Sequence, residues 1–318
     1  MASTRWTVAI LSLVVLANAV GCARQTYRAG APEGMIDVIA HRGASAYAPE
    51  NTLAAFELAI EQGADWFELD THMSADYEII CIHDATVDRT TDGTGAVRDM
   101  TIEELKALDA GSWKDEAYAG ERLPTLGEAL DLAKGRIGVY VELKPIDDDG
   151  PLETHLMSIA SDRTQLLPHH ASRVLSLIEA SGSHNYEMTV RAIQKIRERN
   201  MQDQVVIQSF SPIICATVRA MAPNIPAEYL GAYDPEQPGA WLVFLRWTEL
   251  IGPHGVNLNY THMTQEQLQM FQNRGQSVAV WTVNDPDAMR RMAEWGVDGI
   301  ITDYPDICID VLREMGRR

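Results

Sequence analysis

Four short apolar runs in the first half of the chain end in side chains that can do chemistry. These side chains are His41 and Arg42, Glu68 and Asp70, His83 and Asp84, and Glu142 and Lys144. Residues two apart on a strand point to the same face, so each of the two Glu-containing pairs shares one face. Ionisable groups at four successive strand ends indicate one assembled site.

Three of these groups are carboxylates that predict a metal site. Glu68 and Asp70 would repel each other unless a cation lay between them. With Glu142 they form an all-oxygen set suited to a hard divalent ion, Ca²⁺ or Mg²⁺. Arg42 and Lys144 add positive charge beside that ion, which indicates an anionic ligand such as a phosphate.

Two histidines complete the set. His41 and His83 can act as acid and base near neutral pH. A metal, two cations and two histidines together predict metal-assisted phosphoryl transfer. The alternative is a network of salt bridges that closes the end of a barrel.

The elements that would position these groups alternate along the chain. From residue 36 onward, short β-rich runs alternate with helical patterns, which predicts a parallel sheet with right-handed crossovers. The sequence has no G-x-G-x-x-G or P-loop motif, so the pattern favours a TIM-type (β/α)₈ barrel, in which the carboxyl ends of all strands share one face. Nine strand-like segments are one too many, and we interpret 65–83 as an irregular strand-turn-strand unit within the barrel. The first helix is predicted to start at Asn51 and to stop at Gly63.

One segment interrupts this alternation. Residues 146–186 are too long for a simple βα loop and follow a strand that ends in "VELKP". We expect them to form an excursion or lid on the active face. His169 and His170 lie in this segment and are predicted to be a solvated pair.

Residues 1–21 have the composition of a signal peptide, with Arg5 before an apolar stretch. "ANA" at 17–19 fits ordinary secretion, whereas "AVGC" at 19–22 fits a bacterial lipobox in which Cys22 would carry lipid. We favour an exported, membrane-anchored lipoprotein, with 22–35 as a tether and 36–318 as the barrel domain; plain periplasmic or secreted protein is the alternative. The three remaining cysteines are widely spaced and are predicted to be buried and unpaired.

Composition excludes one class of partner. The chain has 318 residues, 46% of them hydrophobic, and a formal net charge of −19. The length and apolar content allow a large core. The acidic balance makes a nucleic-acid partner unfavourable, and a membrane would be contacted only through lipid on Cys22.

Several short strings make the chain similar to a known family. The chain resembles the glycerophosphodiester phosphodiesterases from residue 37 to about 312. The strings are "HRG" at 41–43, "PENT" at 49–52, "ELD" at 68–70, "HD" at 83–84, "RTTDGTG" at 89–95, "VELKP" at 141–145, "QSF" at 208–210, "WTVN" at 281–284 and "DGIITDYP" at 298–305.

The resemblance implies a role for each candidate residue. It implies a barrel-type fold, a divalent metal, and cleavage of glycerophosphodiesters to glycerol 3-phosphate and an alcohol. His41 and His83 would be the acid/base pair, with His83 favoured as the group that protonates the leaving alcohol. The other roles are metal ligands Glu68, Asp70 and Glu142, phosphate-binding Arg42 and Lys144, and a substrate wall at Trp281. Glu50 is assigned no chemistry.

Two departures from the family pattern concern structure and substrate. Tyr77 stands where a turn glycine is common, and 146–186 is longer than usual. Two other functions therefore remain open. One is a lysophospholipase D that acts on acylated glycerophosphodiesters, and the other is a non-catalytic surface lipoprotein that binds glycerophosphodiesters. The intact histidines and carboxylates argue against the second.

Overall fold

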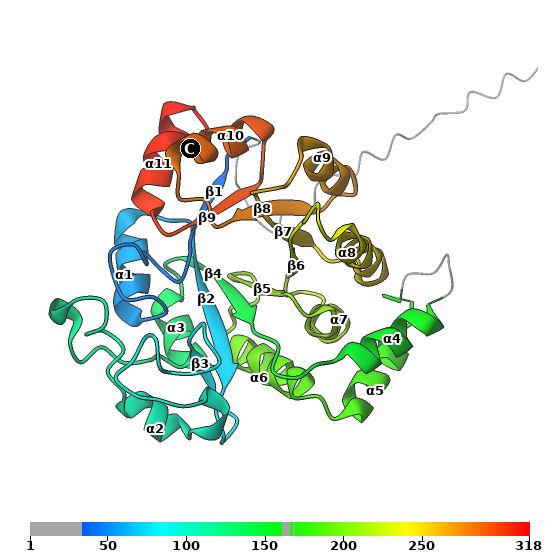
Figure 1. Cartoon of the computed structure of the whole chain (residues 1–318), viewed down its shortest axis with the longest axis horizontal. Coiled ribbons are helices and arrows are strands. Elements are labelled where there is room, and N and C mark those ends of the chain that lie inside the picture. The colour runs from blue at the N-terminus through cyan, green and yellow to red at the C-terminus, as the bar shows by residue number, and fades with distance from the viewer. Residues whose placement is uncertain (1–33, 161–165, 168) are drawn as a thin grey trace, which may run out of the picture.

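The computed structural model of the chain describes residues 34–160, 166–167 and 169–318 (Figure 1). The predicted signal peptide and Cys22 lie outside the described residues. Within those residues, no helix is both long and apolar enough to cross a membrane.

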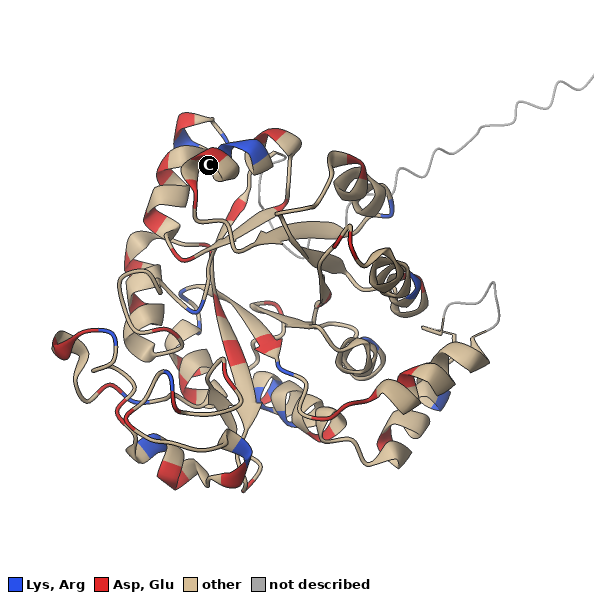
Figure 2. Ribbon diagram, viewed as in Figure 1, with Lys and Arg blue, Asp and Glu red and all other residues tan. Residues whose placement is uncertain are grey.

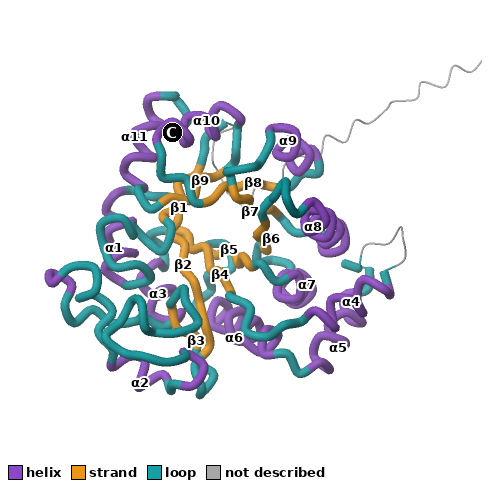
Figure 3. The backbone as a smooth tube through the Cα atoms, in the orientation of Figure 1, coloured by secondary structure: helices purple, strands orange, loops and turns teal. Residues whose placement is uncertain are grey.

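Eight parallel strands form a closed barrel, so the predicted TIM-type fold is confirmed (Figure 3). The strands are β1 (Asp37–Ala40), β2 (Trp66–Met73), β4 (Gly138–Leu143), β5 (Val205–Ser209), β6 (Ala227–Gly231), β7 (Gly255–Asn259), β8 (Ser277–Trp281) and β9 (Gly299–Thr302). The barrel closes because β1 pairs with both β2 and β9.

Helices surround the strands, as crossovers between parallel strands require. They are α1 (Leu53–Gln62), α2 (Ile102–Ala107), α3 (Leu126–Ala133), α4 (Gly150–Ile159), α5 (Ala171–Ser181), α6 (His184–Glu198), α7 (Pro212–Met221), α8 (Pro238–Ile251), α9 (Gln265–Asn273), α10 (Pro286–Trp295) and α11 (Pro305–Glu314). Short 3₁₀ turns occur at Val97–Asp99 and Glu116–Tyr118.

The ninth strand-like segment belongs to a hairpin outside the barrel. β3 (Ile79–Cys81) pairs antiparallel with the end of β2, so the predicted strand-turn-strand unit at 65–83 is present, but its second strand lies outside the barrel and not within it. Tyr77 in the turn has a φ of 66°, which is the left-handed region that favours glycine. The backbone therefore keeps the conformation of a glycine turn, and the exposed Tyr77 ring packs under the Arg191 guanidinium.

The start of α1 differs from its prediction. Thr52, not Asn51, is the N-cap: its side chain accepts a hydrogen bond from the amide of Ala55. Asn51 has a φ of 59° and directs its side chain to another strand. Gly63 ends the helix in the left-handed conformation, as predicted.

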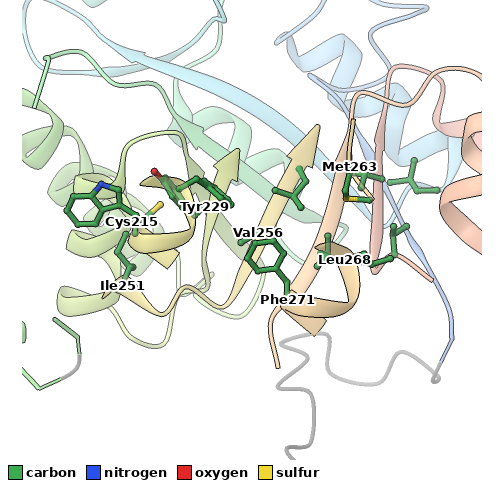
Figure 4. Close-up of a cluster of buried hydrophobic side chains, with 14 of the residues drawn as sticks. Cys215, Tyr229, Ile251, Val256, Met263, Leu268 and Phe271 are labelled. Atoms are coloured by element: carbon green, nitrogen blue, oxygen red, sulfur yellow. The ribbon is translucent and has the colours of Figure 1, made fainter. Parts of the chain in front are cut away.

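Apolar side chains fill the layer between strands and helices. Figure 4 shows part of the largest cluster, in which Val256 on β7 lies beside Phe271 on α9 and Tyr229 on β6 lies near Cys215 on α7. A smaller cluster drawn from the strands, including Tyr140 and other inward-pointing side chains, fills the barrel interior. The three cysteines within the described residues are buried and free, as predicted.

The described residues of the excursion at 146–186 do not form a lid. Its helices α4 and α5 lie at the periphery of the ring, and α5 packs on α7 (Figure 1). Leu156, Val174 and Ile178 are fully buried in the main cluster. Among the described residues of this segment, none lines the cavity at the strand ends. The excursion is therefore present as predicted, but the alternative that it is a lid is wrong for its described residues, because their apolar side chains dock on the outside of the barrel.

Candidate active site

A cavity of about 210 Å³ lies at the carboxyl ends of the strands. Every side chain predicted as a site residue lines it. Its lining is His41, Arg42, Glu68, Asp70, His83, Glu142, Lys144, Gln208, Phe210, Leu230, Trp281, Thr282 and Ile301. Figure 2 shows the acidic segments of β2 and β4 inside the ring of strands.

Three buried carboxylates form the floor of this cavity. Glu68 and Asp70 share one face of β2, and Glu142 is the partner of Asp70 on the neighbouring strand β4. One oxygen from each lies within 4.8 Å of the others. Parallel pairing of β2 and β4 thus brings together Glu68 and Glu142, which are 74 residues apart in sequence. An all-oxygen set of this size fits a hard divalent cation such as Ca²⁺ or Mg²⁺.

The two predicted phosphate-binding cations contact these acids. Lys144 Nζ lies 2.9 Å from Asp70 Oδ1 and 2.6 Å from Glu142 Oε1. Arg42 Nε lies 3.1 Å from Asp70 Oδ2, and the Arg42 amide donates to Glu68 Oε2 at 2.9 Å. Both cations are therefore already in place beside the proposed metal ligands, where a phosphate would also arrive.

The crowding of three carboxylates gives them different pKa values. Burial and the neighbouring Asp70 and Glu142 carboxylates raise the pKa of Glu68 well above its usual value. Burial, followed by the charge of Asp70, raises the pKa of Glu142 to about 7. Burial alone would also raise the pKa of Asp70, but Lys144 and Arg42 hold it below its usual range. Two of the acids thus resist ionisation together, which a bound cation would relieve.

His41 follows β1 and is fixed by an acid from the far end of the chain. Its Nδ1 lies 2.7 Å from Asp303 Oδ1, just after β9. Asp303 also accepts hydrogen bonds from Ser45 Oγ at 3.0 Å and from Asn284 Nδ2 at 2.6 Å. Burial would raise the pKa of Asp303, but the His41 and Asn284 interactions hold it at about 2. With Nδ1 bound to a carboxylate, neutral His41 carries its proton there and leaves Nε2 free to accept one.

His83 is also held by an aspartate, but this aspartate binds an arginine as well. Its Nδ1 lies 2.7 Å from Asp84 Oδ1, and Arg89 Nε donates to Asp84 Oδ2 at 2.7 Å. Arg89 also donates to both Glu50 oxygens at 2.9 and 2.8 Å, and Glu50 accepts from Arg42 at 2.8 Å. Burial lowers the pKa of His83. A carboxylate shared with an arginine supports a protonated histidine less than one with neutral partners does.

Sequence reasoning missed the groups that hold the site residues. Asn51 does not cap the helix as predicted: its Nδ2 donates to Asp70 Oδ2 at 2.9 Å and its Oδ1 accepts from the Asp70 amide at 3.0 Å. The supporting roles of Asp84, Arg89 and Asp303 were not predicted. All four residues lie in the strings shared with the family, which was the available signal.

The opposite part of the lining is uncharged and largely apolar. Phe210 and Trp281 make an edge-to-face contact with ring centroids 5.7 Å apart, and Leu230 and Ile301 continue the wall. Trp281 Nε1 donates to the carbonyl of Asn257 at 3.0 Å. Trp281 is therefore placed at the cavity with its polar edge bonded to the barrel.

The paired histidines in the excursion are not part of this site. His170 precedes α5, and both His169 and His170 are exposed. Within the described part of the chain, Glu68, Asp70 and Glu142 form the one acidic or histidine cluster compact enough to hold a metal.

Comparisons with known proteins agree with this geometry. Residues 41–307 match the Glycerophosphoryl diester phosphodiesterase family. A glycerophosphodiester phosphodiesterase of Caldanaerobacter subterraneus is 35% identical over 281 residues, which cover 88% of this chain and 98% of that protein. One from Bacillus subtilis is 32% identical over 277 residues, covering 85% of this chain and 84% of that protein.

Solved structures give the same result. An Oleispira antarctica phosphodiesterase in complex with the product sn-glycerol-3-phosphate superposes with a TM-score of 0.71 at 28% identity, covering 88% of this chain and 97% of that one. A glycerophosphodiester phosphodiesterase from Agrobacterium tumefaciens superposes with a TM-score of 0.61 at 29% identity, covering 87% and 100%.

Proposed function

Because the chain belongs to the glycerophosphoryl diester phosphodiesterase family and is a glycerophosphodiester phosphodiesterase, we propose that its substrates are soluble glycerophosphodiesters. It hydrolyses them to glycerol 3-phosphate and an alcohol, using a divalent cation and two histidines. One observation carries the proposal: His41 and His83, each tied to a carboxylate through Nδ1, line the cavity that holds three buried acids. The product bound to the Oleispira relative supports the same product here.

The chain's own charges bind the scissile phosphate. Glu68, Asp70 and Glu142 would hold Ca²⁺ or Mg²⁺, which when bound supplies Lewis-acid polarisation of the phosphoryl oxygens. Arg42 and Lys144 bind the phosphate oxygens from the side of these acids. The Arg42 guanidinium is held in orientation by Glu50 and Asp70, so little freedom is lost when the phosphate arrives.

The two histidines move the protons. The substrate's glycerol has a hydroxyl next to the phosphate ester, and His41 Nε2 accepts the proton of that hydroxyl as its oxygen attacks phosphorus. Protonated His83 donates to the departing alcohol. Water then opens the resulting cyclic glycerophosphate with the two roles exchanged. His41 is assigned the base because Asp303, whose other partners are neutral, stabilises the imidazolium that forms when His41 accepts a proton. His83 is assigned the acid because Arg89 offsets the charge of Asp84, so protonated His83 is stabilised less and gives up its proton more readily.

A turnover assay tests this proposal. The purified protein with Ca²⁺ or Mg²⁺ is expected to release glycerol 3-phosphate and choline in equal amounts from glycerophosphocholine. An analogue that lacks the hydroxyl beside the phosphate should not turn over. If the analogue reacts at the normal rate, water attacks directly and the cyclic route is wrong. If no glycerophosphodiester is cleaved, the hydrolase proposal fails and a binding role remains.

The apolar wall favours one second candidate. Phe210 is 42% exposed at the cavity and would meet the part of a substrate that extends beyond the phosphate. A lysophospholipase D would place an acyl chain along this wall. Parallel assays on glycerophosphocholine and its monoacyl form distinguish the two, since a lysophospholipase D has the higher kcat/KM on the acylated substrate.

Export and lipidation of Cys22 are also proposed. The support is the "AVGC" string after an apolar stretch in the first residues of the chain. Mass spectrometry of the mature N-terminus tests this proposal. A lipid-modified Cys22 is expected, and an unmodified chain that begins at Val20 would leave plain secretion.

A further inference from the structure

A row of polar side chains runs through the barrel interior, starting at the candidate active site. Gln208 Nε2 donates to Glu68 Oε1 at 3.2 Å, and Asn257 Nδ2 donates to Gln208 Oε1 at 2.6 Å. The side chain of Asn257 lies within hydrogen-bonding reach of the Glu228 carboxyl. Ser277 Oγ donates to Glu228 Oε1 at 2.9 Å. Glu68, Gln208, Asn257 and Glu228 are each at most 2% exposed, so bulk solvent does not reach these groups.

The hydrogen bonds in this row have one direction. When Glu68 is ionised, as a metal ligand is, it can only accept, so Gln208 must present its amide nitrogen there. The Gln208 oxygen then accepts a hydrogen bond from the Asn257 amide nitrogen. The Asn257 oxygen is therefore left facing away from the site. Two atoms in the described residues of this row are buried without a hydrogen-bond partner, and they are Asn257 Oδ1 and Glu228 Oε2.

We propose that Glu228 is held as a neutral carboxylic acid whose hydroxyl donates to Asn257 Oδ1, and that this bond fixes the row of amides that ends on Glu68. A single proton on Glu228 satisfies both unpartnered oxygens, whereas an ionised Glu228 satisfies neither. An unmade hydrogen bond on a buried polar atom is costly. Glu228 is thus a positioning residue that acts through Asn257 and Gln208.

The surroundings of Glu228 support the neutral form. Among the described residues, no ion pair includes Glu228. Burial raises the pKa of Glu228 to about 8, and the charge of Asp298 acts in the same direction, against the hydrogen bond from Ser277 and the nearby Asn257 side chain. Gly255 leaves the space that the carboxyl occupies, because a Cβ there would lie 2.8 Å from Glu228 Oε1.

The orientation of Glu68 is what this row controls. Gln208 donates to Glu68 Oε1 and the Arg42 amide donates to Glu68 Oε2, so each oxygen has one donor, and one Glu68 oxygen lies within 4.8 Å of an oxygen of Asp70 and of Glu142. If Asn257 turned its oxygen to Gln208, Gln208 would present an oxygen to Glu68 and repel it. Changes to groups that orient a metal ligand typically cost about 10–100-fold in metal affinity.

Two variants separate a hydrogen-bond donor from simple filling of space. Glu228→Gln keeps an acceptor for Ser277 and supplies an N–H to Asn257, whereas Glu228→Leu supplies neither. Calorimetric titration with Ca²⁺ is expected to give Glu228→Gln an affinity within about threefold of the wild type and Glu228→Leu a loss of at least about tenfold. Asn257→Ala removes the next group in the row and should lose as much Ca²⁺ affinity as Glu228→Leu. It also tests the row if Glu228→Leu fails to fold. Thr217→Val, which removes a buried hydroxyl outside the row, should leave Ca²⁺ affinity unchanged.

Infrared difference spectra test the proton itself. At pH 6 with Ca²⁺ present, the wild type is expected to show a carboxylic-acid carbonyl band that is absent from Glu228→Gln and kept in Glu68→Gln. No such band, or equal losses of affinity in Glu228→Gln and Glu228→Leu, would overturn the inference. The inference rests on the proposed function only in taking Glu68 as a metal ligand. A band at Glu228 without Ca²⁺ binding would therefore contradict the metal role and leave the protonated Glu228 standing.

Discussion

The two halves of the barrel contribute different kinds of side chain to one cavity. The strands from β1 to β4, with the residues that follow them, supply all of its ionisable lining, and β5 to β9, with the residues that follow them, supply neutral lining. The first group is His41, Arg42, Glu68, Asp70, His83, Glu142 and Lys144, and the second is Gln208, Phe210, Leu230, Trp281, Thr282 and Ile301. Bond breaking and substrate shape are thus assigned to different parts of the sequence. Changes in the charged half should remove activity, whereas changes in the neutral half should alter which substrate is preferred.

The largest effect is expected from removing the metal. Chelation should abolish activity, Ca²⁺ or Mg²⁺ should restore it, and Asp70→Asn should do comparable damage because a hard cation loses a charged ligand. Initial rates with and without chelator measure this. Asp131→Asn is the control, since Asp131 pairs with Arg199 on the outer surface. Full activity in excess chelator would contradict the metal assignment.

The two histidines come next. His41→Ala and His83→Ala should each lower kcat by roughly 10²–10⁴-fold, because each removes one positioned proton transfer. Rates on glycerophosphocholine check this, with the exposed His155→Ala as a control that should retain full activity. A variant that keeps more than a tenth of wild-type kcat would exclude its histidine from the chemistry.

The partners of the histidines allow a finer comparison within the charged half. Asp303→Asn should lower kcat by about 10²-fold, since an amide N–H at His41 Nδ1 would move the ring proton to Nε2 and block proton acceptance. Asp84→Asn should cost about tenfold, because Arg89 already offsets the Asp84 charge. KM should change little in either case. Equal losses in the two variants would remove the asymmetry on which the base and acid roles rest.

A smaller effect is expected in the neutral half. Phe210→Ala should lower kcat/KM on an acylated substrate by about tenfold and on glycerophosphocholine by less, because it removes apolar contact beyond the phosphate. Steady-state kinetics on the two substrates measure the ratio. Leu242→Ala on α8 is the matched control, since Leu242 is 65% exposed and outside the cavity. An equal fall on both substrates would argue against a role in substrate choice.

Stability against pH tests whether the second half is truly neutral. Glu228 has a folded pKa of about 8 against an ordinary value of 4.5, so the folded state holds its proton more tightly than the unfolded chain does. This contribution to the free energy of unfolding is complete below the ordinary pKa and is lost as the pH rises through the folded pKa. Denaturant unfolding from about pH 5 to about pH 9 should therefore show a steeper fall for the wild type than for Glu228→Gln. If the free energy of unfolding falls equally with pH in both proteins, Glu228 has the same pKa in the folded and unfolded states.

The charged half was the more predictable of the two. Period-two spacing on strands located Glu68 with Asp70, and Glu142 with Lys144, because β geometry alone fixes which side chains share a face. The barrel and the hairpin followed from alternating patterns and from one surplus strand. These are local signals, so no tertiary information was needed to read them.

The supporting groups could not be found in this way. His41 and Asp303 are 262 residues apart and meet only because β1 lies beside β9. Asn51 precedes a helix and has the residue type of a cap, but the chain turns there to reach Asp70. The length of the excursion predicts a cover over the site, whereas the spacing of Val174 and Ile178 on α5 decides where it packs. Long-range pairing is absent from any single window of sequence.

The hairpin of β2 and β3 sets the distance between the two catalytic histidines. His83 is carried by a strand outside the barrel, whose register pairs Thr71 with Cys81 and Met73 with Ile79. A slip of one residue would translate His83 by about 3.4 Å and reverse the direction of its side chain. One residue inserted in the turn at 74–78 that shifted this register would therefore abolish activity, although every catalytic side chain would still be present. Tolerance to insertion should be lowest at this turn, although it lies on the surface.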